Sequence, residues 1–319
     1  MAKKSLSGRI IKILIFIFSL AVLFLLLRHI GFDKVADSFV KVGLTGAAVL
    51  LLCGFIENGS DALALSFAIP EKISFINVFS SNCIGALTNL IAPWEAGEVV
   101  KGGLIGKKIG TAPAIKGIVL WNYIFKLSKA WALVVILLIS FAAGPDYTTN
   151  QFWVVSAAAA LGFLPFFGMM ILIKSNISVK VVKLLKLLGK KNCDDMLKKA
   201  EELDESMKQF KKERPGDYWA VFFIQFFARF VSLATFIACA KFAGFDYSFS
   251  MLSLAYCAVT LSGYIVSLVP AKFGVSEGAG FLMFSFLGLD GGAGLLITFI
   301  LRIKMIIAMG IASLFVVVK

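Results

Sequence analysis

The sequence is poor in the residues that carry most metal-dependent and acid–base enzyme chemistry. It has one histidine, His29, and five cysteines that show no C-x-x-C spacing. A structural zinc site needs several Cys or His ligands at short spacings, and a disulfide framework needs regularly placed cysteines. We therefore expect no metal site, no cofactor and no His-based catalytic centre. This shortage favours a transporter-like role over an enzyme.

Charged residues are also scarce. They make up 16% of the chain, while 59% of its residues are hydrophobic. A soluble domain usually has about 25% charged and about 45–50% apolar residues. Apolar segments of about 20 residues, the length that crosses a bilayer's hydrocarbon core, recur to the C-terminus. The composition predicts an all-α polytopic membrane protein.

The net charge of +13 would suggest nucleic-acid binding in a soluble protein. Here the basic residues lie at the ends of apolar segments and in one long loop, where they set topology and meet anionic lipid headgroups. We expect membrane lipids as partners and no nucleic acid. Association into a homo-oligomer is left open.

Eight hydrophobic segments organise the chain. Six are long enough for full spans, at 10–30, 44–69, 113–140, 151–173, 217–243 and 290–318. Two more, 73–109 and 248–289, are interrupted by Pro and Gly. The first span follows a basic N-terminus, is about twice as long as a signal-peptide core and lacks a small-residue cleavage site, so we expect a retained signal-anchor helix.

Loop charges predict the orientation. The segment from Lys174 to Asp217 carries twelve Lys and Arg against eight Asp and Glu, whereas the loop GPDYTTN has no Lys or Arg. Basic short loops stay on the cytoplasmic side. We therefore expect a cytoplasmic loop at 174–216, cytoplasmic N- and C-termini and a multi-pass protein of the cell (inner) membrane. The weakly amphipathic segment GFDKVADSFVKVG is expected along the outer surface.

The first interrupted stretch is predicted to re-enter the membrane. A complete crossing at 73–92 would place Lys101, Lys107 and Lys108 outside and would expel the basic loop. A hairpin that enters from the cytoplasm and turns near APWEAG avoids this, because its return arm of about 15 Å spans half a bilayer. A full crossing followed by an interfacial helix is the alternative. The stretch 248–289 repeats the pattern from the outer face.

The two breaks share a spacing of Pro, Gly and Glu. The residues are Pro93, Gly97 and Glu98 in the first break, and Pro270, Gly274 and Glu277 in the second. Within one transmembrane domain, 1–319, this predicts an inverted repeat of 44–140 and 217–318 with two opposed re-entrant hairpins. Interrupted helices form midplane sites in transporters, and helix N-termini attract anions. Two ordinary turns at the surface are the alternative.

Charged residues inside the apolar segments are the candidate site residues, because each costs at least about 2.5–3.5 kcal/mol at a helix centre. The expected substrate contacts are Glu98, Lys101, Arg229, Lys272, Glu277 and Arg302. Glu57 and Asp61, four residues apart on one face, are expected as counter-ions or as a coupling site. The alternative is that these groups pair only to hold the bundle, and Lys304 is equally compatible with snorkelling to an interface.

At its two breaks the chain resembles the lysylphosphatidylglycerol synthetase transmembrane-region family, also called flippase-like integral membrane proteins. The matching residues are Asn89, Pro93, Gly97, Glu98 and Lys101, then Pro270, Gly274, Glu277 and Gly278, then Arg302 in the final span. The resemblance covers essentially the whole chain. The chain departs from the family at WNYIFK, where an E-R pair followed by Asp is common.

The resemblance implies movement of lipids between leaflets. We expect a lipid flippase or lipid-linked translocase for an anionic lipid of the phospholipid or polyprenyl-phosphate type. The chain ends at Lys319, directly after the last span, so no soluble synthase domain is expected. The alternatives are an inverted-repeat secondary transporter of a small solute or ion, and a membrane subunit that assists a lipid-modifying enzyme.

Overall fold

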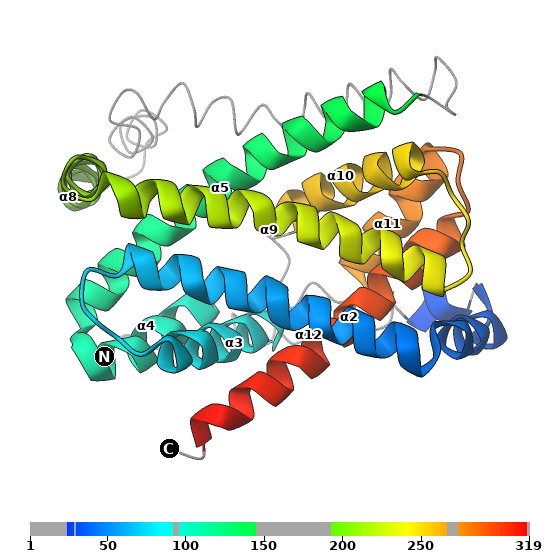
Figure 1. The fold of residues 1–319 in the computed structure, drawn as a ribbon, viewed down its shortest axis with the longest axis horizontal. Helices are drawn as coiled ribbons and strands as arrows, with labels where there is room; N and C mark the ends of the chain where they lie inside the picture. The colour runs from blue at the N-terminus through cyan, green and yellow to red at the C-terminus, as the bar shows by residue number, and fades with distance from the viewer. Residues whose placement is uncertain (1–23, 29, 92–95, 145–192, 267–273, 318–319) are drawn as a thin grey trace.

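The computed structural model describes residues 24–28, 30–91, 96–144, 193–266 and 274–317, and every regular element in these ranges is an α-helix (Figure 1). The long helices are α2 (Phe32–Ala68), α5 (Thr111–Ala142), α9 (Pro215–Phe242) and α12 (Gly291–Val317). The others are α3 (Phe75–Ile91), α4 (Ala96–Ile109), α8 (Cys193–Glu213), α10 (Phe249–Val266) and α11 (Val275–Phe286). The all-α prediction is confirmed.

Four of these helices, α2, α5, α9 and α12, are long and apolar enough to cross a membrane. They coincide with the predicted spans 44–69, 113–140, 217–243 and 290–318. Most of 10–30 and all of 151–173 fall outside the described residues, as does the first part of the loop 174–216. The remainder of that loop is α8, which lies beyond one end of the bundle (Figure 1).

Helix α2 begins twelve residues before the predicted span, because the predicted surface segment is itself helical. The two parts meet at Gly43, whose φ of 57° and ψ of −172° are not helical. Glycine adopts positive φ without the steric cost that other residues meet. The segment 32–42, which we call the α2 arm, therefore has a different direction from the rest of α2.

The long part of α2 packs antiparallel to α9. Arg214, just before α9, donates hydrogen bonds to the carbonyl oxygens of Phe67 and Ile69 at the end of α2. At the other end of the pair, Gly46 lies against the ring of Phe242. We call these the Arg214 end and the Phe242 end of the bundle.

The hairpin of α3 and α4 belongs to the Arg214 end. Gly97 of α4 lies so close to α3 that a Cβ atom on it would be 1.8 Å from the carbonyl oxygen of Gly85. The chain enters α3 shortly after Ile69 and leaves α4 directly into α5, whose Gly117 packs against Ile69. Both open ends of the hairpin therefore lie at the Arg214 end.

The hairpin of α10 and α11 belongs to the Phe242 end. Ser250, at the start of α10, donates a hydrogen bond of 2.8 Å to the carbonyl oxygen of Ser140 near the end of α5. Phe284, near the end of α11, lies 6.2 Å from Tyr247 between ring centroids. The two hairpins thus enter the bundle from opposite ends (Figure 1).

Helix α12 contacts both hairpins. Its Gly294 faces Gly280 of α11 so closely that a Cβ atom on Gly294 would be 2.3 Å from the Gly280 carbonyl oxygen. Further along, its Met309 and Ala312 form a small apolar cluster with Cys83 of α3. Between these contacts α12 crosses α2, where the candidate site lies.

Candidate substrate-binding site

Four ion pairs lie between the two ends of the bundle, among the described residues. They are Glu57–Lys304, Asp61–Arg229, Glu98–Lys101 and Glu277–Arg302. Seven of the eight predicted charged residues are in these pairs. The eighth, Lys272, lies outside the described residues, as do Pro93 and Pro270.

The first break places Glu98 in the first turn of α4 and Lys101 one turn later. Their charged groups are 3.0 Å apart, and the Lys101 side chain is 2% exposed. The amine of Lys101 also lies 4.3 Å from the centroid of the Trp121 ring. An aromatic face and a carboxylate together stabilise an ammonium that has little contact with water.

Two side-chain amides complete this group. The Asn89 Oδ1 accepts a 2.7 Å hydrogen bond from the N–H of Gly97, which has no helical partner at the start of α4. The Asn122 Nδ2 donates to Glu98 at 3.3 Å. Asn122 belongs to WNYIFK, the segment in which the chain differs from the family pattern. At this position an uncharged amide therefore contacts the carboxylate of Glu98.

The second break holds its carboxylate differently. Gly274, with φ of 74°, precedes α11, and its N–H donates a 2.8 Å hydrogen bond to Glu277 in the first turn. The other carboxylate oxygen of Glu277 lies 2.6 Å from Nε of Arg302 on α12. The Glu277 side chain is 0% exposed. This carboxylate therefore joins the start of one helix to the middle of another.

The two acids of α2 each reach a different helix, although they lie on one face of α2 as predicted. Glu57 is 2.7 Å from Lys304 of α12. Asp61 is 3.4 Å from Arg229 of α9, and that guanidinium also lies over the ring of Phe125. These pairs connect α2 to α12 and to α9.

A cavity of about 290 Å³ lies among α2, α9, α10, α11 and α12, and we call it the central cavity. Its charged lining consists of Glu57, Arg302 and Lys304. Six hydroxyl side chains also line it: Ser232, Thr235, Tyr256, Thr260, Ser276 and Thr298. Two cations, one carboxylate and several hydroxyls form a lining suited to an anion such as a phosphate group.

The sequence predicted Arg302 as a substrate contact. It did not decide between pairing and snorkelling for Lys304, and it did not predict the hydroxyl side chains. Ser and Thr in apolar helices often bond to their own backbone, as Thr235 does to the carbonyl oxygen of Val231. Single hydroxyls therefore give no signal in the sequence. Lys101 and Arg229, also predicted as substrate contacts, do not line the central cavity.

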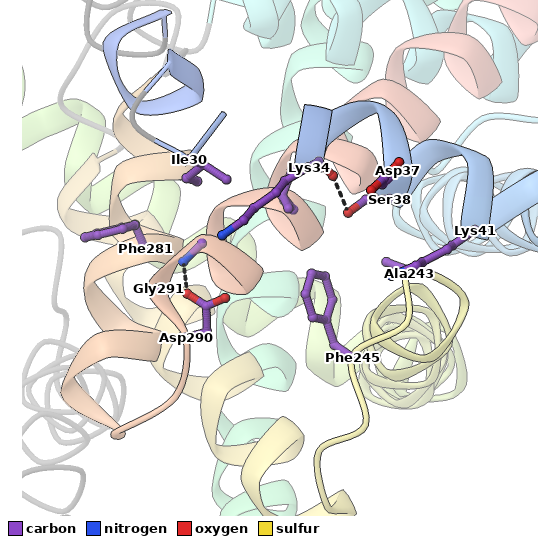
Figure 2. A pocket seen from close by; sticks show the side chains of 12 residues that line it. Ile30, Lys34, Asp37, Ser38, Lys41, Ala243, Phe245, Phe281, Asp290 and Gly291 are labelled. Carbon is purple, nitrogen blue, oxygen red and sulfur yellow. Dashed lines mark hydrogen bonds between the residues drawn. The ribbon is translucent and has the colours of Figure 1, made fainter. Parts of the chain in front are cut away.

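A second cavity, of about 510 Å³, lies at the Phe242 end, and we call it the end cavity (Figure 2). The α2 arm, the turn after α9 and the start of α12 enclose it. Its charged lining residues are Lys34, Asp37, Lys41 and Asp290, none of which was predicted. The available signal was the row of charges three and four residues apart in the α2 arm.

Comparison with known families adds an independent finding. A family profile described as the lysylphosphatidylglycerol synthase TM region matches residues 9–313. The chain belongs to this family. Both breaks and the central cavity lie inside the matched region, so the suspected resemblance is confirmed. Searches of curated proteins and of solved structures each returned no match.

Proposed function

We propose that this protein moves a lipid with an anionic, phosphate-bearing headgroup between the leaflets of the membrane. The headgroup passes through the central cavity while the acyl or prenyl chains stay in the bilayer. The observation that carries this proposal is the placement of Arg302 and Lys304, together with six hydroxyl side chains, in one cavity inside an apolar helical bundle. Membership of a family named for a lipid-related transmembrane region supports it.

The size and chemistry of the central cavity favour a headgroup over a whole lipid. Its volume of about 290 Å³ is at the lower limit of about 300 Å³ for small-molecule sites. The guanidinium of Arg302 can hold two phosphate oxygens at once, and the ammonium of Lys304 adds a point charge. Outside the cavity, Leu52 and Leu63 of α2 are exposed apolar side chains that suit contact with lipid chains.

The two hairpins support a mechanism of alternating access. Helix pairs that enter from opposite ends are the arrangement expected of re-entrant segments in an inverted repeat. Such repeats rock against each other around a fixed midplane site. We propose that α3–α4 and α10–α11 re-enter the membrane in this way and open the central cavity to one leaflet at a time.

Glu57 and Glu277 have different roles in this mechanism. The side chain of Glu57 is 20% exposed and contacts Lys304 across the cavity, whereas Glu277 is fully buried. An arriving phosphate can replace Glu57 at Lys304 and leave the Glu277–Arg302 pair in place. Lys304 is therefore the cation released for the substrate, and Arg302 is the cation that stays oriented.

Reconstitution in liposomes tests the proposal. Vesicles of phosphatidylcholine with a fluorescent phosphatidylglycerol are treated with a quencher that reaches only the outer leaflet. We expect complete quenching with the protein, and a Lys304→Gln variant should exchange lipid at least about tenfold more slowly. Lys116→Gln is the matched control, because Lys116 is exposed at the start of α5, outside both cavities.

Two results would overturn the proposal. One is exchange no faster than in empty vesicles for several anionic lipids, including a polyprenyl phosphate. The other is uptake of a small anionic solute with no lipid exchange, which would identify a secondary transporter instead.

A further inference from the structure

The end cavity brings together three segments that are far apart in the sequence. They are the α2 arm, the turn Ala243–Phe245 and the residues Asp290–Gly292 at the start of α12. Figure 2 shows the Lys34 side chain extending from the α2 arm toward Asp290 and Gly291. With about 510 Å³, the cavity is larger than the central one and within the range of small-molecule sites.

The charges of this cavity are balanced but are not paired with one another. Lys34, Asp37 and Lys41 line it from the α2 arm, and Asp290 lines it from the start of α12. Within the part of the chain that the structure describes, no ion pair joins any two of these four residues. Asp290 uses one carboxylate oxygen to accept a 2.8 Å hydrogen bond from the N–H of Gly292. A ligand of one sign would be attracted by half of the lining and repelled by the other half.

The surroundings of the cavity indicate a lipid. The α2 arm and the residue after its kink expose large apolar side chains, with Val40 78% and Leu44 88% exposed. Ile30 and Phe281 add apolar surface to the cavity itself. An amphipathic helix of this kind lies at the level of the headgroups, with its apolar side toward the acyl chains. A ligand here can place charges in the cavity and its tails beside the arm.

We propose that the end cavity binds the headgroup of a zwitterionic phospholipid that carries a phosphate and a primary ammonium. Lys34 and Lys41 contact the phosphate, and Asp37 and Asp290 accept hydrogen bonds from the ammonium. The site is separate from the central cavity and does not depend on its proposed function. Both cavities nevertheless border α12, because Leu296 lines the end cavity and Thr298 lines the central cavity.

Lipid binding to the purified, delipidated full chain tests this assignment. The protein is titrated with phosphatidylethanolamine, phosphatidylglycerol or phosphatidylcholine of equal chain length, and bound lipid is counted by native mass spectrometry. We expect phosphatidylethanolamine to bind most tightly, because only its ammonium can donate hydrogen bonds to the two aspartates. Lys41→Gln and Asp37→Asn should each weaken this binding about fivefold, since an exposed charge contributes modestly.

Matched controls separate this site from general lipid adhesion. Lys116→Gln removes one exposed positive charge far from the cavity in sequence and should leave phosphatidylethanolamine binding unchanged. Free phosphoethanolamine, which lacks tails, should bind much more weakly than the lipid. Equal binding of all three lipids, unchanged binding in Lys41→Gln and Asp37→Asn, or equal affinity for free phosphoethanolamine would each overturn the proposal. None of these results bears on leaflet exchange through the central cavity.

Discussion

The two breaks share a sequence pattern but hold their carboxylates in different ways. In the first, Glu98 pairs with Lys101 of its own helix, and its side chain is 20% exposed. In the second, Glu277 is completely buried and pairs with Arg302 of another helix. Both members of the first pair belong to α4, with Trp121 and Asn122 of α5 beside them, whereas the second pair joins α11 to α12. The same sequence motif therefore gives an ion pair within one helix at the first break and an ion pair between two helices at the second.

The two cations also have different surroundings. The ammonium of Lys101 lies over the Trp121 ring as well as beside Glu98, whereas Arg302 pairs with a carboxylate that has no contact with water. A buried charge without a partner is costly in a low-dielectric interior. The structure therefore predicts unequal responses to the same substitution at the two breaks.

The largest expected effect is that of Glu277→Gln. Glutamine keeps the size of the side chain and can still accept a hydrogen bond from the N–H of Gly274, but it removes the negative charge beside the Arg302 guanidinium. We expect a loss of about 3–5 kcal/mol in stability, measured as a lower unfolding temperature of the detergent-purified protein. Combining it with Arg302→Met should recover part of the loss, since the positive charge is then removed together with the negative one. A Glu277→Gln protein as stable as the wild type would show that the buried Glu277–Arg302 pair does not stabilise the second break.

A smaller effect is expected from Gly97→Ala in the first hairpin. The new methyl group would be 1.8 Å from the Gly85 carbonyl oxygen, so α3 and α4 must separate, at a cost of about 1–3 kcal/mol. Gly103→Ala on the same helix is the matched control, because nothing lies within 4 Å of a Cβ atom there. That change should be neutral or stabilising by up to about 1 kcal/mol. Equal unfolding temperatures for the two variants would show that the hairpin is not closely packed.

The smallest effect on stability is expected from Glu98→Gln. Its neighbour Lys101 keeps its contact with the Trp121 ring, and the Glu98 side chain is partly exposed to water, so we expect a loss of about 1 kcal/mol, well below that of Glu277→Gln. The same unfolding measurement on both variants tests the ranking. An equal or greater loss of stability for Glu98→Gln would contradict the prediction that the ion pair of the second break contributes more to stability.

Several parts of this structure were predictable from the sequence, each for a physical reason. The spans of α5, α9 and α12 follow from the length of apolar sequence that crosses a bilayer. The start of α11 follows from Gly274 of the predicted second break, whose positive φ directly precedes the helix. For Asp61 the sequence predicted a role as counter-ion, since a buried acid needs a base, but it did not identify Arg229 as the partner.

The partners themselves could not be predicted. Glu57 and Lys304 are 247 residues apart, and only the crossing of α2 and α12 brings them together. The end cavity was missed because Lys34 and Lys41 lie on an amphipathic segment, where basic residues are normally explained by the membrane surface. Which charges share a cavity depends on helix crossings that a local pattern does not encode.

The contacts of α12 with both hairpins have a mechanical consequence. Near one end its Gly294 touches α11, and near the other its Met309 and Ala312 touch α3, while Lys304 is joined to α2 between them. In the alternating-access mechanism proposed above, a small tilt of α12 about its contact with α2 would weaken its packing against one hairpin and strengthen its packing against the other. The two ends of the bundle would then open in turn and not together.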